Sequence, residues 1–201
     1  MIRNIFRFIA LTLIVIYSIY GQIYSQTDST QTLKGIGNIL WDMNMNEVEK
    51  LETLDQAFIS YDPEVLGYMT DDFDSEKAGA LLLYFFLDHR LLSAIYEFET
   101  NINDVEDYLS DFKVQKSKLI EKYGVPDRDT LIFEDESQKE LQELAKSIIE
   151  GNLLIICNWF YKNGQIVLSL ANLDQTDSKL DYKLEYLTNE FLYKYRRPDS
   201  D

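Results

Sequence analysis

The sequence predicts an α+β domain in which two or three helices pack on one face of a mostly antiparallel sheet. Pairs of apolar, strand-like runs stand on either side of a short polar connection at two places, 80–98 and 153–171. Helix-start signals, followed by apolar residues at helical spacing, lie upstream of each pair. Strands that are joined by tight turns run antiparallel, so we expect an antiparallel sheet.

The first helix is expected directly after an extended segment at 35–41. Asn44 is followed three residues later by Glu47, which is the spacing of a capping box. Val48, Leu51 and Leu54 then recur at helical spacing, and the helix is expected to end near Asp55. Two short strands are expected after it, at 57–61 and 65–69.

The first hairpin is predicted where two apolar runs, 80–87 and 91–98, flank Asp88, His89 and Arg90. The first of these strands is apolar on both faces. At least part of its second face should therefore be covered by other parts of the chain.

The longest helix is predicted at 103–122, starting with the cap pair Asn103 and Glu106. Acidic residues cluster in its first turn and lysines in its last turns, which suits the helix dipole. Gly124 and Pro126 then end the helix.

The remaining elements follow in the same way. A strand is expected at 130–133, a third helix from Ser137 to Gly151, and a hairpin at 153–171 around Asn163-Gly164. Residues 180–187 alternate between apolar and charged side chains, which predicts a strand with one wet face. A short helix is expected at 189–195. The parts 35–99 and 103–187 each run from helix into hairpin, which suggests an internal duplication although no residue-level repeat is visible.

Residues 1–25 are interpreted as an export signal. Arg3 and Arg7 form a basic start, and the apolar run 8–20 has the length of a cleaved signal rather than that of a membrane-spanning helix. Cleavage is expected after Gly21 or Ser25, with an uncleaved anchor as the alternative. No cysteine stands near the cleavage site, so lipidation is not expected. Residues 26–34 are interpreted as a flexible leader and 35–197 as a single domain, periplasmic or secreted after export.

The charge of the chain restricts its partners. The net charge is −16, and removal of the two signal arginines makes it more negative. Such a surface repels nucleic acids and anionic lipid, which are held largely by lysine and arginine. We therefore expect no nucleic-acid binding and no membrane-embedded mature domain. Cys157 is the only cysteine, so an intramolecular disulfide is impossible.

A resemblance to known domains rests on several short motifs in a fixed order. They run from Trp41-Asp42-Met43 and Asn46-Glu47-Val48 through Tyr123-Gly124-Val125-Pro126 to Trp159 and Ile166-Val167-Leu168-Ser169-Leu170. In these motifs the chain resembles exported bacterial domains of uncharacterised function. Its first helix entry is also similar to SmpA/OmlA (BamE-like) and β-lactamase-inhibitor-like domains. That resemblance implies helices on an antiparallel sheet and a role in protein contacts. The chain departs from it by lacking the lipoprotein cysteine and by its long helix 103–122.

The candidates for chemistry are few. A nucleophilic triad would have to use His89, the only histidine, and His89 is expected in a solvated turn. Cys157 is expected to be a buried thiol on the side of its strand that carries Leu153, Ile155 and Trp159. One His and one Cys cannot supply the usual ligands of zinc, and neither a cofactor nor a metal site is predicted. The acidic segment 71–76 has the 1-3-5 spacing of a calcium loop but lacks its glycine and its final glutamate, which leaves at most a weak cation site.

The aromatic strands are the remaining lead. Tyr84, Phe86, Tyr96 and Phe98 are expected to share one face of the first hairpin. If helices cover that face, these residues are core; if not, they form a contact surface for a partner. We therefore expect an exported, non-enzymatic domain that binds a protein or an envelope component. The alternative is a carboxylate-dependent hydrolase of the cell envelope, which would need two converging acids in a deep pocket.

Overall fold

The computed structural model describes residues 30–70, 79–100, 104–133, 143–173 and 179–195, and its main feature is a large antiparallel sheet. The described strands of this sheet number eight, in the order β3-β4-β5-β6-β10-β9-β8-β7. Their bounds are β3 Asp55–Tyr61, β4 Glu64–Thr70, β5 Ala80–Leu87, β6 Arg90–Phe98, β7 Arg128–Phe133, β8 Leu153–Tyr161, β9 Gly164–Ala171 and β10 Asp181–Thr188. The short strands β1 Gly35–Ile36 and β2 Ile39–Leu40 form a separate two-stranded sheet. The predicted α+β class and the antiparallel sheet are both confirmed.

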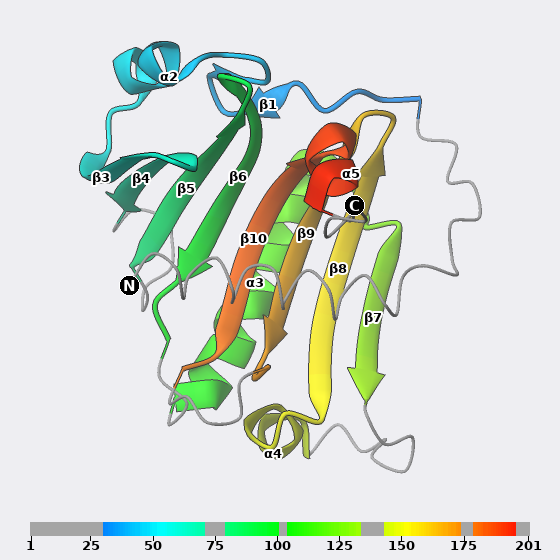
Figure 1. Cartoon of the computed structure of the whole chain (residues 1–201). Helices are drawn as coiled ribbons and strands as arrows, with labels where there is room; N and C mark the ends of the chain where they lie inside the picture. The colour runs from blue at the N-terminus through cyan, green and yellow to red at the C-terminus, as the bar shows by residue number, and fades with distance from the viewer. Residues whose placement is uncertain (1–29, 71–78, 101–103, 134–142, 174–178, 196–201) are drawn as a thin grey trace, which may run out of the picture.

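The sheet consists of two meanders that meet at its centre (Figure 1). Strands β3 to β6 pair in chain order, and so do β7 to β10. β6 and β10 pair antiparallel along the seam between them, with Ile95 opposite Glu185. A helix precedes each meander: α2 Met45–Leu51 before β3 and α3 Val105–Tyr123 before β7. The order of one helix and four strands therefore repeats, except that the short helix α4 (Leu144–Ile149) stands between β7 and β8 without a counterpart between β3 and β4. We call 45–98 the first unit and 105–188 the second unit.

The helices divide between the two faces of the sheet. α2, α3 and α4 (Leu144–Ile149) bury Val48, Phe112 and Ile148 in one hydrophobic cluster with residues from β4, β5, β6, β8, β9 and β10. α3 runs behind the sheet along β10 and β9 in Figure 1, whereas α5 (Asn189–Tyr195) lies on the near side. Phe191 of α5 belongs to a second cluster, in which its ring lies 5.8 Å from that of Phe85. Hence three helices share one face, which we call the helix face, and α5 occupies one end of the other.

Local signals explain where the first two helices begin and end. The capping box of α2 is formed by both of its hydrogen bonds, from Glu47 N to Asn44 Oδ1 (3.1 Å) and from Asn44 N to Glu47 Oε2 (2.8 Å). α2 ends at Leu51, one turn earlier than expected. α3 ends at Gly124, whose φ of +86° is readily adopted by glycine. Its predicted cap residue Asn103 and the start of the predicted helix at Ser137 lie outside the described residues.

Two hairpin turns fix the register of the strands. Asp88 and His89 both have positive φ, as a two-residue turn of the primed type requires. In the other hairpin the turn residues are Lys162 and Asn163, and Gly164 already pairs as the first residue of β9. A Cβ atom on Gly164 would lie 2.2 Å from the carbonyl oxygen of Leu187, so this close approach of two strands requires glycine.

The prediction that the charged side chains of 180–187 face solvent is wrong. Asp181, Lys183 and Glu185 of β10 are only 5–7% exposed. Lys183 Nζ lies 3.6 Å from Glu97 and 3.8 Å from Asp181, which compensates part of the buried charge. Burial raises the pKa of the Glu185 carboxyl to about 7. Because β10 lies at the centre of the sheet, β6 and β9 place neighbouring side chains on both sides of Lys183 and Glu185, which reduces their exposure.

No helix in the described part of the chain combines the length and the apolar character that crossing a membrane requires.

Candidate functional site

The four aromatic residues that were predicted to share a face do share the helix face. Tyr84, Phe86 and Phe98 are buried in its core cluster, at 2–6% exposure, and Tyr96 packs against this cluster while remaining partly exposed. As they stand, three of the four rings are core rather than an exposed patch. Tyr84 and Tyr96 also line an open cleft, which is the strongest candidate for a site.

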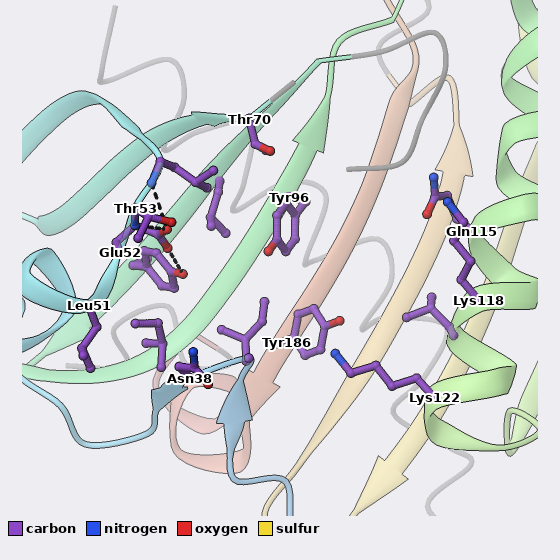
Figure 2. Close-up of a pocket in the computed structure, with 17 residues that line it drawn as sticks. Asn38, Leu51, Glu52, Thr53, Thr70, Tyr96, Gln115, Lys118, Lys122 and Tyr186 are labelled. Atoms are coloured by element: carbon purple, nitrogen blue, oxygen red, sulfur yellow. Dashed lines mark hydrogen bonds between the residues drawn. The ribbon is translucent and has the colours of Figure 1, made fainter. Parts of the chain in front are cut away.

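The cleft lies on the helix face between the segment that follows α2 and the C-terminal half of α3 (Figure 2). Its volume is about 520 Å³, within the range of about 300–1,000 Å³ that is usual for small-molecule sites. The sheet forms the floor, α3 forms one wall, and the end of α2 together with the β1–β2 hairpin forms the other. The lining residues are Ile36, Gly37, Asn38, Ile39, Leu51, Glu52, Thr53, Leu54, Thr70, Leu82, Tyr84, Tyr96, Gln115, Lys118, Leu119, Lys122 and Tyr186.

The floor alternates tyrosines with smaller residues because of the strand register. One row of neighbours across the sheet contains Tyr84, Ala94 and Tyr186, and the next row contains Leu82, Tyr96 and Leu184. Each hydroxyl therefore stands next to a shorter aliphatic side chain. The floor offers both apolar surface and polar groups that can orient a ligand.

Hydrogen bonds to Glu52 connect the wall beside α2 to the floor of the cleft. The Glu52 carboxylate accepts hydrogen bonds from the Tyr84 hydroxyl (2.7 Å) and from the backbone N–H groups of Thr53 (2.8 Å) and Leu54 (3.2 Å). Burial raises the pKa of Tyr84, and its hydrogen bond to Glu52 adds to the rise. Because the phenol stays protonated at neutral pH, it remains a donor to this carboxylate.

The wall formed by α3 is cationic. Lys118 and Lys122 are one helical turn apart and both line the cleft. Lys122 reaches from α3 toward Tyr186 (Figure 2), and its Nζ lies 5.0 Å from the ring centroid of Tyr123. The Tyr123 hydroxyl donates to that of Tyr186 at 3.4 Å. Burial raises the pKa of Tyr186 and of Tyr96, so both remain neutral phenols.

A second cavity of about 480 Å³ shares Gly37 and Lys122 with the cleft. Its other lining residues include Lys34, Tyr123 and Tyr161. The segment that borders it is attached to the second hairpin turn: the Asn163 side chain accepts from Leu33 N and donates to Leu33 O, each at 2.8 Å. Residues 30–34, which belong to the predicted leader, thus contact the β8–β9 turn and add a third lysine near the cleft.

The described lining of the cleft contains one carboxylate, whereas a glycosidase needs two placed carboxyl groups. This carboxylate is Glu52, whose oxygens already accept three hydrogen bonds. Within the described residues, no group of three or more His, Cys, Asp or Glu side chains is placed to hold a metal ion. The acidic segment 71–76 lies outside the described residues.

The two residues predicted as the only candidates for a nucleophilic site are not brought together. His89 lies in the β5–β6 turn with its side chain 85% exposed, and its Nδ1 contacts Glu64. Cys157 is fully buried in β8, on the predicted side with Leu153, Ile155 and Trp159. β10 and β9 stand between β6 and β8. Burial and the neighbouring Asp129 raise the pKa of the Cys157 thiol to about 12, so this thiol is not activated.

Sequence reasoning missed most of the cleft. It named Tyr84 and Tyr96 but not Glu52, Lys122 or Tyr186. The helical spacing of Lys118 and Lys122 was visible, yet a lysine pair near the end of a helix is also what the helix dipole favours. Only the pairing of β6 with β10 brings Tyr186 beside the first hairpin.

Comparison of the chain with protein-family models, with curated proteins and with solved structures finds no match in any of the three.

Proposed function

We propose that this chain is an exported, non-enzymatic binding domain that holds a protein or an envelope component in the cleft on the helix face. The observation that carries the proposal is the combination of an open cavity of about 520 Å³ with a floor of protonated tyrosines and a lysine-bearing wall. Convergent polar groups within a partly apolar concavity are typical of binding sites. The proposed resemblance to protein-binding exported domains agrees with it.

The alternative, a hydrolase that uses carboxylates, receives less support. Among the described lining residues, Glu52 has no second carboxylate beside it, and its two oxygens accept hydrogen bonds from the Tyr84 hydroxyl and from backbone N–H groups. A general acid must donate a proton to its substrate, whereas both Glu52 oxygens act as acceptors toward protein groups.

Site-specific photo-crosslinking tests the location of the site. A photoreactive p-benzoylphenylalanine replaces Thr53, which is exposed and lines the cleft, in cells that express the full chain. The matched control places the same group at Val125, which is 79% exposed and outside the lining. We expect a discrete crosslinked species from the Thr53 position and none from the Val125 position.

Two results would contradict the proposal. Equal crosslinking from both positions, or none from either, would remove the cleft as the binding site. Hydrolysis of an envelope substrate that the Glu52→Gln variant abolishes would replace the binding role with the hydrolase.

Export is a separate part of the proposal and rests on the sequence. Intact-mass measurement of the mature protein is expected to show a chain that begins after Gly21 or Ser25. A mature protein that retains Met1 and the apolar run would support the uncleaved anchor instead.

A further inference from the structure

We infer that the cleft takes a small amphipathic organic anion: an apolar, flat body carrying one anionic group that faces α3. This inference rests on the proposed function, because it names the ligand class of the same site. It is carried by three features of the lining: the placement of its charges, the state of its hydroxyl groups and the position of its apolar residues.

The charges of the lining are separated across the cleft. Lys118 and Lys122 stand on the α3 wall, and Glu52, the one carboxylate among the described lining residues, stands on the opposite wall. Within the described residues, no carboxylate lies within ion-pair distance of Lys122, and its Nζ lies over the Tyr123 ring. In a chain of net charge −16, two lysines that face one cavity form a local reversal of the surface charge. Such a reversal favours an anion at this wall.

Glu52 does not offset these lysines by direct pairing. Both of its oxygens are occupied, Oε1 by Thr53 N and Leu54 N and Oε2 by the Tyr84 hydroxyl. These contacts keep the carboxylate against the α2 wall. A ligand that enters the cleft therefore finds cations on one side and a fully hydrogen-bonded carboxylate on the other.

The hydroxyl groups near the lysines act as donors. The Tyr123 hydroxyl donates to Tyr186, which leaves the proton of the Tyr186 hydroxyl to point toward another acceptor. Since burial raises the pKa of Tyr186, that proton is retained at physiological pH. An ammonium and a phenol that both donate match the needs of a carboxylate or a sulfonate.

Most of the apolar lining belongs to elements other than α3, with Leu119 as the exception. Ile36, Ile39, Leu51 and Leu54 belong to the hairpin and the segment around the end of α2, and Leu82 belongs to the floor. A ligand with its anion at α3 would therefore place its body over apolar side chains and tyrosine rings. This arrangement accounts for both halves of the inferred ligand.

Two fluorescent dyes with one carbon framework test the inference. 8-Anilinonaphthalene-1-sulfonate carries a sulfonate, and N-phenyl-1-naphthylamine is the same aromatic body without it. We expect the sulfonate dye to bind the full chain at one site and the neutral dye to bind at least about fivefold more weakly, the factor that one partly exposed ion pair supplies.

Matched variants test whether the sulfonate group of the dye binds beside Lys122. Lys122→Met should weaken the sulfonate dye by about fivefold and leave the neutral dye unchanged, because it removes one partly exposed ion pair. Lys113→Met, an exposed lysine on α3 outside the lining, should change neither dye. Thr53→Trp, which fills the cleft from the opposite wall, should weaken both dyes. Thermal melting of each variant confirms that the fold is retained.

The outcomes separate the two proposals. Equal affinity of the dyes, with no effect of Lys122→Met but a loss on Thr53→Trp, overturns the anion and keeps the cleft as a binding site. Failure of both dyes to bind also overturns the inferred ligand class, while the crosslinking at Thr53 still decides the proposed function independently.

Discussion

The first and second units each begin with a helix that is followed by a four-stranded meander, which α4 interrupts in the second unit, and they differ in the length of that first helix. α3 has 19 residues and α2 has 7. At a rise of about 1.5 Å per residue, α3 spans roughly 28 Å and α2 only about 10 Å. α3 therefore runs along its half of the helix face, whereas α2 reaches only one end of its half. The cleft lies where the short helix leaves the floor uncovered, so the difference in helix length creates the site.

The largest expected effect tests how strongly α3 holds the second unit. Phe112 is buried on α3, and its ring lies 6.1 Å from that of Tyr182. Phe112→Ala should lower the free energy of unfolding by about 3–5 kcal/mol, the usual cost of emptying a buried aromatic site. Urea denaturation measures it. Val114→Ala on the same helix, at a residue 46% exposed, is the control and should stay within about 0.5 kcal/mol.

Because Cys157 is buried in the second unit, we expect the free energy of unfolding to depend on the ionisation of its thiol. Its pKa is raised to about 12 by burial and by Asp129, so the folded chain keeps a proton that the unfolded chain loses above its pKa of about 8.5. The stabilisation is therefore complete below about pH 8.5 and is lost as the pH rises toward 12.

This effect is measured against the Cys157→Ala variant. From pH 9 to 10 the advantage of the native chain over the variant should shrink by up to about 1.4 kcal/mol, the value for one proton per pH unit. A constant difference over that range would show that the thiol is not buried as described.

The third prediction concerns what stabilises the short helix. α2 buries Val48 and is held at its start by the capping box. Asn44→Ala should cost about 1 kcal/mol and increase hydrogen exchange at the amide of Val48. In α3 the corresponding residue Asp104 makes no side-chain cap bond, so Asp104→Ala should cost clearly less. Equal costs would mean that the two helices do not differ in this way.

The smallest effect is expected in the β5–β6 turn of the first unit. His89 has a φ of +62°, which glycine adopts more easily than histidine. His89→Gly should raise the free energy of unfolding by about 0.5–1 kcal/mol. Because His89 lies outside the cleft, dye binding should not change. A loss of stability would show that its contact with Glu64 outweighs the backbone strain.

The sequence contained the local features of the fold and little of its long-range organisation. The capping box at Asn44, the turn at Asp88-His89 and the helix end at Gly124 were predictable because each depends on neighbours in the chain. The seam was not, because nothing in the pattern of β6 or β10 selects the other as partner. Without the seam, neither the meeting of Tyr96 with Tyr186 nor the cleft could be predicted.

The burial of the charged side chains of β10 could not be predicted from the sequence either. Asp181, Lys183 and Glu185 alternate with apolar residues as in a strand with a solvated face, and their burial depends on the surrounding fold. An alternating pattern shows which side chains share a face, and here Tyr182 and Tyr186 do share the helix face. It does not show whether the opposite face is in water.

The seam between β6 and β10 also has a consequence for how fragments of this chain would assemble. The two strands meet antiparallel, as two copies of one strand would meet across the axis of a symmetric dimer. A fragment that ends before α3 would carry β6 as an open edge, and open edges recruit other strands. Such fragments are expected to pair edge to edge through β6. The two units of the present protein thus meet as the subunits of a dimer of helix-plus-meander modules would, within one polypeptide, and only the second unit has a long helix.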